Sequence, residues 1–167
     1  MKMQFRSISL IAMFSAGLLG GCASSGPMAG AAASPDQTLT SFHDAASKAD
    51  EARYFDLFAK SGSVFLGTDA TERWELGAFR EFAHPYFAAG KGWAYTLVPG
   101  SRTISFLRGS NVAYFDELLQ NSKLGACRGS GVLVIENGQW KVAQYNLSIP
   151  VPNDKAETVV KMIQGGR

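Results

Sequence analysis

Two long apolar runs lie within residues 127–153, and the dipeptide Asn137-Gly138 separates them. Asn-Gly between runs rich in Val, Leu, Ile and Tyr is a strong signal for a tight hairpin, so we predict two antiparallel strands. Both runs carry apolar residues on both faces, which is typical of strands in the middle of a sheet. Polar side chains interrupt the runs at the end away from the turn, where we expect a pocket: Arg128, Ser130, Gln144 and Asn146.

Helical spacing of apolar residues marks four further segments. Residues 34–37 have the pattern of a capped helix start, and apolar residues follow at helical spacing through residue 49. Asp50 can cap a second, short helix that ends near residue 60. A third helix covers about residues 75–89, and Pro85 should kink it or end it near His84. A last short helix follows residue 153.

Strands account for most of the remaining chain. Residues 63–66 form a short strand, and the apolar segment 93–107 is interrupted by Pro99-Gly100, which predicts a bent sheet. Residues 112–121 return beside that segment. A two-residue Gly109-Ser110 loop would place Arg102 opposite Glu117 among aromatic side chains, whereas another loop length would break that pair. Helices segregated from one antiparallel sheet predict an α+β fold.

The N-terminal pattern is that of an exported protein. Lys2 and Arg6 precede an uncharged apolar run that is too short for a comfortable membrane span, as in a signal peptide. The run ends in Leu19-Gly20-Gly21-Cys22, which resembles the bacterial lipoprotein box and implies acylation of Cys22 after removal of residues 1–21. An ordinary signal peptide with a stray cysteine is the alternative. Residues 22–34 are small and flexible, which predicts a tether.

Composition narrows the classes of function. The chain has 167 residues, 46% hydrophobic and 18% charged, which fits one globular domain after export. The mature chain would have 14 acidic side chains and equally many basic ones, without the clustered Lys and Arg that a nucleic-acid surface needs. Cys127 would be the sole unmodified thiol, so we expect no disulfide. No metal-ligand spacing is present, and we expect no metal and no cofactor; His43 fits a hydrogen-bonded histidine at the core or its rim.

Several strings of residues resemble a known family. The chain resembles the SnoaL-like branch of the nuclear transport factor 2-like superfamily over about residues 36–154, both in the order of its elements and in four strings of residues. These strings are FLGTDATERW, VAYFDELL, RGSGVLV and NGQWKVAQYNLSIPVPN. The resemblance implies a cystatin-like roll: a cone-shaped, curled antiparallel sheet wrapped on about three N-terminal helices, with a ligand cavity inside and a short C-terminal helix. We therefore assign residues 35–167 to a SnoaL-like domain. Members include ketosteroid isomerase, polyketide cyclases, dehydratases and binding modules, so the fold alone does not decide the function.

The resemblance also implies which side chains of the last strand face the cavity. The inward positions would be Trp140, Val142, Gln144, Asn146 and Ser148. Many relatives have histidine where this chain has Asn146, which can orient a ligand but cannot exchange a proton. A two-residue turn would leave Arg128 outside; a three-residue loop with a bulge would slip the pairing by one residue and bring Arg128 and Ser130 inside. We favour the slip, because inward Gly129 and Gly131 would leave the wall almost without side chains.

The first functional hypothesis is a binding module for a small apolar or anionic molecule. Arg128 would pair with an anionic group, and Asn146 and Gln144 would orient the ligand, with Ser130 beside them. The apolar wall would come from aromatic residues that could also be plain core: Trp74, Trp93, Tyr95 and Phe115.

The second hypothesis is an acid/base enzyme of the isomerase, dehydratase or cyclase type. Its candidate catalytic residues are Asp69, Glu117 and His84. A carboxylate in an apolar cavity has a raised pKa and can act as a base near neutrality. Asp69 also fits a turn acid that bonds its own backbone, and Glu117 fits a structural partner of Arg102. The general-base Asp of ketosteroid isomerase and its Tyr/acid oxyanion pair do not fall on matching positions of this sequence, which weakens the case for isomerase chemistry.

The third hypothesis concerns the outer face of the sheet. This face would be too apolar to remain exposed to solvent, which predicts a homodimer or an envelope-protein partner. Its apolar residues would be Ala143, Tyr145 and Leu147, flanked by Val132 and Val134. The residue after Cys22 is Ala23 and not Asp, so in a host with two membranes the lipoprotein resemblance implies sorting to the periplasmic face of the outer membrane.

Overall fold

The computed structural model describes residues 32–165. The predicted signal peptide, Cys22 and the tether up to residue 31 lie outside the described residues. In order, the elements are α1 Pro35–Ser47, α2 Glu51–Asp56, β1 Val64–Leu66, β2 Arg73–Glu75, α3 Leu76–Ala88, β3 Thr96–Leu97, β4 Thr103–Phe106, β5 Val112–Asn121, β6 Gly125–Glu136, β7 Gln139–Ser148, the 3-10 turn η1 Asn153–Lys155 and α4 Ala156–Gly165.

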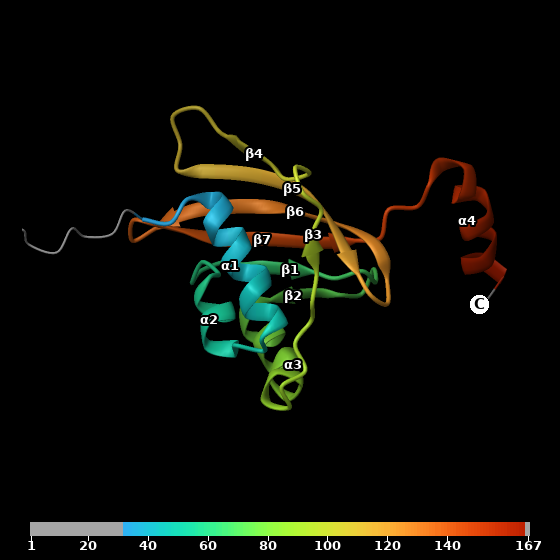
Figure 1. Ribbon diagram of the computed structural model, residues 1–167, viewed down its shortest axis with the longest axis horizontal. Coiled ribbons are helices and arrows are strands. Elements are labelled where there is room, and N and C mark those ends of the chain that lie inside the picture. The colour runs from blue at the N-terminus through green and yellow to red at the C-terminus, as the bar shows by residue number, and fades with distance from the viewer. Residues whose placement is uncertain (1–31, 166–167) are drawn as a thin grey trace, which may run out of the picture. The chain divides into compact units, whose positions relative to one another are not determined.

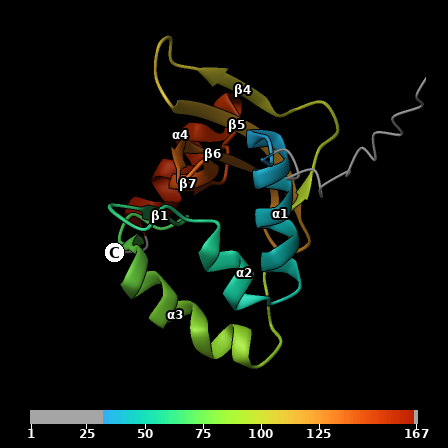
Figure 2. The same ribbon diagram turned by 90° about the vertical axis from the view of Figure 1, so that its left-hand side faces the viewer.

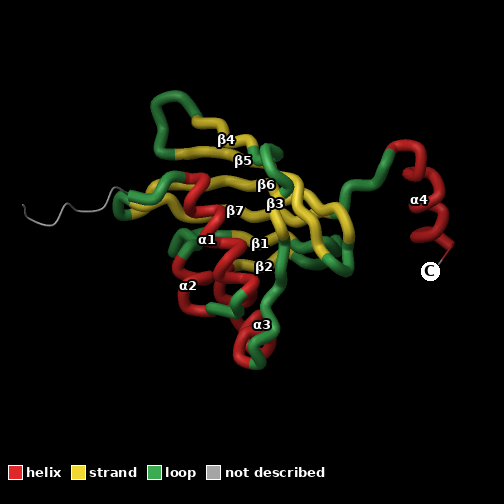
Figure 3. The backbone as a smooth tube through the Cα atoms, viewed as in Figure 1, coloured by secondary structure: helices red, strands yellow, loops and turns green. Residues whose placement is uncertain are grey.

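One curved sheet with helices on one face forms the domain (Figure 1, Figure 3). Its strand order is β2-β1-β7-β6-β5-β3, with β4 also paired to β5. All pairs are antiparallel except β1 with β7. Helices α1, α2 and α3 lie on the same side of the sheet, as the second view also shows (Figure 2). The predicted α+β fold with a curled sheet is confirmed.

Local signals in the sequence account for the starts of α1 and α2. Ser34 and Gln37 form a reciprocal capping box at α1, and the Asp50 side chain accepts from Arg53 N at the start of α2. The predicted helix over about residues 75–89 is confirmed as α3, and of the two alternatives for Pro85 an end near His84 is wrong, because the helix continues through Pro85 to Ala88. Pro85 lies on the exposed side of α3, whereas Phe79, Ala83 and Phe87 face the core, so water can satisfy the carbonyl that lacks a partner.

The predicted pairing of β4 with β5 is confirmed. Ile104 lies opposite Phe115 and Thr103 opposite Asp116, which brings Arg102 beside Glu117. The chain bends between β3 and β4 at Pro99-Gly100, where Gly100 has a φ of 74°. Strand β2 was not predicted; it pairs with β1 across the loop that holds Gly67 and Glu72.

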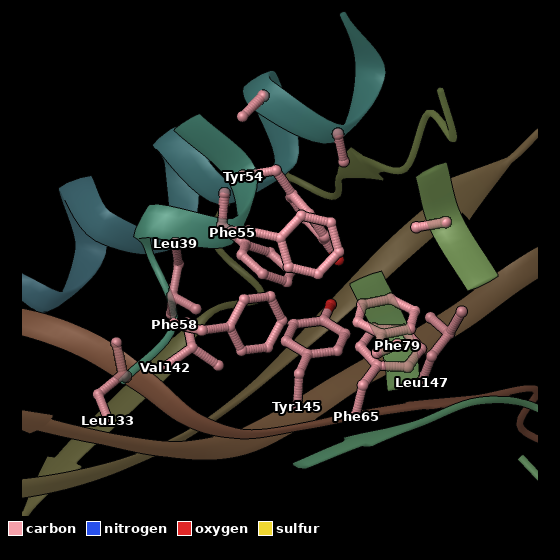
Figure 4. Packing of buried hydrophobic residues seen from close by; sticks show 14 of the residues in the cluster. Leu39, Tyr54, Phe55, Phe58, Phe65, Phe79, Leu133, Val142, Tyr145 and Leu147 are labelled. Atoms are coloured by element: carbon pink, nitrogen blue, oxygen red, sulfur yellow. The ribbon is translucent and has the colours of Figure 1, made fainter. Parts of the chain in front are cut away.

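The predicted inward facing of Gln144, Asn146 and Ser148 is wrong, because β7 contains a bulge. Val142 pairs with Leu133, but Gln144 pairs with Val132, which leaves Ala143 without a partner. A single extra residue reverses the facing of all later side chains. Tyr145 and Leu147, predicted to face outward, therefore point into the core, as Figure 4 shows.

The turn itself has the two residues Asn137 and Gly138, both with positive φ. The pairing does slip by one residue, so Asn146 lies opposite Ser130, but the bulge at Ala143 causes the slip and the turn does not. The prediction that Arg128 and Ser130 face inward is also wrong: Arg128 is exposed, and Ser130 is only half-buried.

Gly129 and Gly131 face inward instead of Arg128 and Ser130. A Cβ atom on Gly129 would lie 2.3 Å from the Tyr145 hydroxyl, and one on Gly131 would lie 1.9 Å from the Gln144 carbonyl oxygen. The two glycines thus leave room for the Tyr145 side chain and for the backbone beside the bulge. Cys127, on the same side of β6, is a buried free thiol, as predicted.

Aromatic side chains fill the space between the helices and the middle of the sheet (Figure 4). Phe58, which has no exposed surface, has its ring centroid 5.3 Å from that of Phe42, 5.6 Å from that of Tyr54 and 6.1 Å from that of Phe79. Phe115 also belongs to this core and is 3% exposed. The space between the helices and the middle of the sheet is therefore mostly packed.

Candidate functional site

A cavity of about 200 Å³ opens where β1, β2, α3 and the segment before β3 meet. Its lining is mainly aromatic and consists of Phe65, Gly67, Thr68, Glu72, Trp74, Phe79, Phe82, Trp93, Tyr95 and Leu147. The rings contact one another. The rings of Phe65 and Phe79 are stacked with their centroids 4.1 Å apart, and the rings of Trp74 and Phe82 are stacked with their centroids 4.9 Å apart. A cavity of this size and lining suits a small apolar molecule.

Glu72 supplies the only charged side chain in that lining. It is half-buried, its Oε2 atom accepts a hydrogen bond of 3.2 Å from Asp69 N, and within residues 32–165 it forms no ion pair. Its side chain lies over Gly67, where an added Cβ atom would lie 2.1 Å from Glu72 Oε2. The absence of a side chain at Gly67 therefore leaves the room that the Glu72 carboxylate occupies.

A smaller space of about 10 Å³ lies deeper and shares Phe65, Trp93, Tyr95 and Leu147 with the cavity. Its other lining residues are Phe42, His43, Ala46, Tyr54 and Tyr145. This volume is close to that of a single water. The Tyr54 hydroxyl is the one buried side-chain polar atom without a hydrogen bond in the described part of the chain, and burial raises its pKa far above the usual range.

Behind His43 lies a buried carboxylate, Glu117. His43 Nε2 is 2.6 Å from Glu117 Oε1, and the Tyr145 hydroxyl donates to the same oxygen at 3.1 Å. Arg102 Nε donates to Glu117 Oε2 at 2.7 Å, while Arg102 Nη1 donates to Asp36 Oδ1 at 2.9 Å. Glu117 has no exposed surface, and the Arg102 side chain is 4% exposed. Both carboxylate oxygens are thus occupied by protein donors.

The electrostatics of Glu117 follow from those contacts. Burial alone would raise its pKa, but the hydrogen bond and charge of His43, together with Arg102, hold the pKa of this carboxyl below its usual value. An ionised carboxylate can only accept hydrogen bonds, so His43 Nε2 carries the proton and donates it in the hydrogen bond to Glu117 Oε1. Burial and then the Glu117 charge raise the pKa of Tyr145, which keeps its hydroxyl a donor.

The structure separates the predicted ligand-binding residues into three groups. Trp74, Trp93 and Tyr95 line the cavity. Phe115 lies in the packed core and lines neither space. The four polar residues lie on the face of the sheet that points away from the helices: Arg128, Ser130, Gln144 and Asn146. On that face Asn146 Nδ2 is 3.5 Å from Ser130 Oγ.

The three predicted catalytic residues do not come together. Asp69 is an exposed turn acid whose Oδ1 accepts from Thr71 N at 2.8 Å and from Thr71 Oγ1, and these bonds lower its pKa. His84 is exposed on α3 and pairs with Glu51. Glu117 is buried as the partner of Arg102, the structural role that the sequence also allowed.

Sequence reasoning missed Glu72 and the link between His43 and Glu117. Glu72 follows Thr71 in a loop pattern, and it lines the cavity from the loop that directly precedes the unpredicted strand β2. His43 was predicted as a hydrogen-bonded histidine, which is confirmed, but its partner lies 74 positions away along the chain. The spacing of helical residues carries no signal for such a partner.

Two further properties concern the described residues 32–165. They contain no group of three or more His, Cys, Asp or Glu side chains placed to hold a metal ion. None of their helices is long and apolar enough to span a membrane.

Comparison with known proteins places the chain by family and by fold. The SnoaL-like domain family matches residues 36–152. No curated protein matches. Among solved structures, a cystatin-like protein of unknown function from Nostoc punctiforme is 15% identical with a TM-score of 0.55, covering 69% of this chain and 87% of that one.

Two other structures are similar. A nuclear transport factor 2-like protein of unknown function from Pseudomonas putida is 13% identical with a TM-score of 0.56, covering 72% of this chain and 87% of that one. A candidate scytalone dehydratase from Novosphingobium aromaticivorans is 11% identical with a TM-score of 0.54, covering 70% of this chain and 81% of that one. At such identities the structures establish the fold alone. With the family match over most of its length, the chain belongs to the SnoaL-like domain family.

Proposed function

We propose that this domain binds a small, largely apolar molecule in the cavity beside Trp74 and Trp93. The observation that supports this most is the continuous aromatic lining around about 200 Å³ of space. Within the described lining there is no Arg, Lys or His, and the one charged group is the Glu72 carboxylate. The earlier expectation of an anionic ligand held by Arg128 finds no support in this arrangement, because Arg128 lies on the opposite face of the sheet.

A variant at the mouth of the cavity tests this proposal. Thr68 is exposed and lines the cavity, so Thr68→Trp would fill the mouth without removing core contacts. With indole as the probe and calorimetry as the readout, we expect Thr68→Trp to weaken binding by about tenfold or more, equivalent to ~1.4 kcal/mol. The matched control is Ala70→Trp, which adds the same ring to an exposed position outside the lining. Equal affinity in Thr68→Trp and wild type would contradict the proposal.

Proton transfer at the same cavity is the second candidate function. Glu72 supports it, because a carboxylate without an ion pair beside apolar rings is the type of group that acts as a general base. Glu117 does not support it, because both of its oxygens already accept from protein donors. Deuterium incorporation into a bound ketone, such as 2-indanone incubated in D2O, separates the two functions, since binding alone leaves the ligand unchanged.

We also propose that the mature chain is anchored to the cell envelope through Cys22, on the periplasmic face of the outer membrane. The lipoprotein-box residues 19–22 support this proposal. Cys22→Ala is expected to move the protein from the membrane fraction to the soluble fraction in cells of its host, because acyl chains on the thiol provide the anchor. Cys127→Ala, which alters the buried thiol, should leave the distribution unchanged. Membrane retention of Cys22→Ala would count against the anchor.

A homodimer through the outer face of the sheet remains a proposal, with a corrected set of residues. Tyr145 and Leu147 are buried in the core and do not contribute. The apolar side chains on that face include Tyr114, which is 51% exposed, and Leu118, which is 40% exposed, together with the half-buried Val132.

A further inference from the structure

We propose that the cavity selects a small organic cation, a molecule with an ammonium or trimethylammonium group, over its neutral analogue. This inference rests on the proposed binding function and specifies the ligand class. It combines two features of the same lining: the half-buried aromatic side chains of Trp74, Trp93 and Tyr95, and one carboxylate, Glu72, without a cationic partner in the described residues. Aromatic rings attract cations through the negative potential of their faces, and tryptophan does so most strongly.

The aromatic part of the lining comes from four separate segments. Phe65 and Trp74 stand on β1 and β2, Phe79 on α3, and Trp93 on the segment before β3. The ring centroids of Trp74 and Phe79 are 5.7 Å apart, and those of Phe79 and Trp93 are 6.1 Å apart, so neighbouring rings form one continuous wall. Trp74, Trp93 and Tyr95 are half-buried, and they therefore present surface to a ligand.

The carboxylate is held in place before any ligand arrives. Asp69 N donates to Glu72 Oε2, and Gly67 leaves the space that this oxygen occupies. The hydrogen bond uses one oxygen of the carboxylate, and in residues 32–165 no Lys or Arg neutralises its charge. A half-buried, preorganised negative charge beside aromatic side chains favours a cation and disfavours an anion.

The experiment compares two soluble probes of nearly the same shape, choline and its neutral isostere 3,3-dimethylbutan-1-ol. Calorimetry with the wild-type protein is expected to show choline binding about tenfold more tightly. Glu72→Gln keeps an acceptor for Asp69 N but removes the charge, so it should abolish most of that preference while the affinity for the neutral probe stays the same. Glu75→Gln is the matched control: it makes the same change on β2, outside the lining, and should retain the preference.

Gly67→Ala provides a second, independent variant. Its φ lies in the ordinary range for L-residues, so the backbone tolerates alanine, but the new methyl group displaces the Glu72 carboxylate. We expect a weaker preference for choline with the charge still present in the chain. Unchanged preference in both Glu72→Gln and Gly67→Ala overturns the inference.

Further outcomes separate this inference from the proposed function. Equal affinity of the wild type for the two probes, or binding of indole but of neither probe, would overturn cation selection and leave the apolar cavity function standing. If indole, choline and the neutral alcohol all fail to bind, the proposed function itself is wrong, and the inference falls with it.

Discussion

Glu117→Gln is expected to lower the free energy of unfolding by about 3 kcal/mol, measured by urea denaturation. The substitution removes the charge that faces the Arg102 guanidinium, whose side chain is only 4% exposed. Breaking a buried pair in this way is strongly destabilising because it leaves one charge buried and uncompensated. The remaining contact between Arg102 and the exposed Asp36 keeps the expected loss near the lower end of the usual range.

The neighbouring carboxylate on the same strand offers a matched control. Asp116 is exposed on the outer face, so Asp116→Asn should change the free energy of unfolding by less than about 0.5 kcal/mol. The double variant Arg102→Met, Glu117→Gln should be more stable than Glu117→Gln alone, because it removes the uncompensated cation. A loss below about 1 kcal/mol in Glu117→Gln would contradict the role assigned to this buried pair.

The pH dependence of stability gives the same pair a second readout. The folded protein holds the pKa of Glu117 below its usual value. This contribution to stability is therefore fully present above the unfolded pKa of about 4.3 and is lost as the pH falls through the lower folded pKa. Wild type should lose more stability in acid than Glu117→Gln does. Equal acid sensitivity of the two would be the contrary result.

Phe58→Ala is the second substitution with a large expected effect, a loss of about 3–5 kcal/mol in the free energy of unfolding. Phe58 has no exposed surface and contacts rings of α1, α2 and α3, so its removal leaves a cavity among three helices. Phe106→Ala, at a position that is 59% exposed and contacts the Trp140 ring, should cost less than about 1 kcal/mol.

Phe58 also distinguishes stability from binding. It lines neither the cavity nor the deeper space, so the folded fraction of Phe58→Ala should still bind indole with nearly wild-type affinity. A stability change of less than about 1.5 kcal/mol would mean that the aromatic cluster is not the main packing core. Loss of indole binding in the folded protein would mean that the cavity depends on the cluster more than the contacts indicate.

The fold was largely predictable because its signals are local or periodic. The capping box at Ser34, the Asn137-Gly138 turn and the break at Gly100 each determine a backbone conformation through the residues present. A turn of the two residues Gly109 and Ser110 gives the pairing of β4 with β5 that the structure shows. The same pairing places Arg102 opposite Glu117, and the structure contains this ion pair. Such features need no knowledge of distant parts of the chain.

The site was harder to predict because one inserted residue controls it. Ala143 has no distinctive chemistry, yet the bulge there moves Gln144 and Asn146 to the outer face and brings Tyr145 and Leu147 inside. The bulge is supported from outside the hairpin: Val142 N donates to Leu57 O, and Ala59 N donates to Val142 O. Those contacts join segments more than 80 positions apart, so the alternation within the strand could not reveal them.

Native mass spectrometry of the full chain purified from its host tests the central claim most directly. The claim is that the aromatic cavity beside Trp74 and Trp93 holds a small molecule. We predict that wild type and Ala70→Trp carry the same small, largely apolar adduct and that Thr68→Trp has lost it. An adduct of equal occupancy in Thr68→Trp, or a wild-type protein without any adduct, would contradict the account.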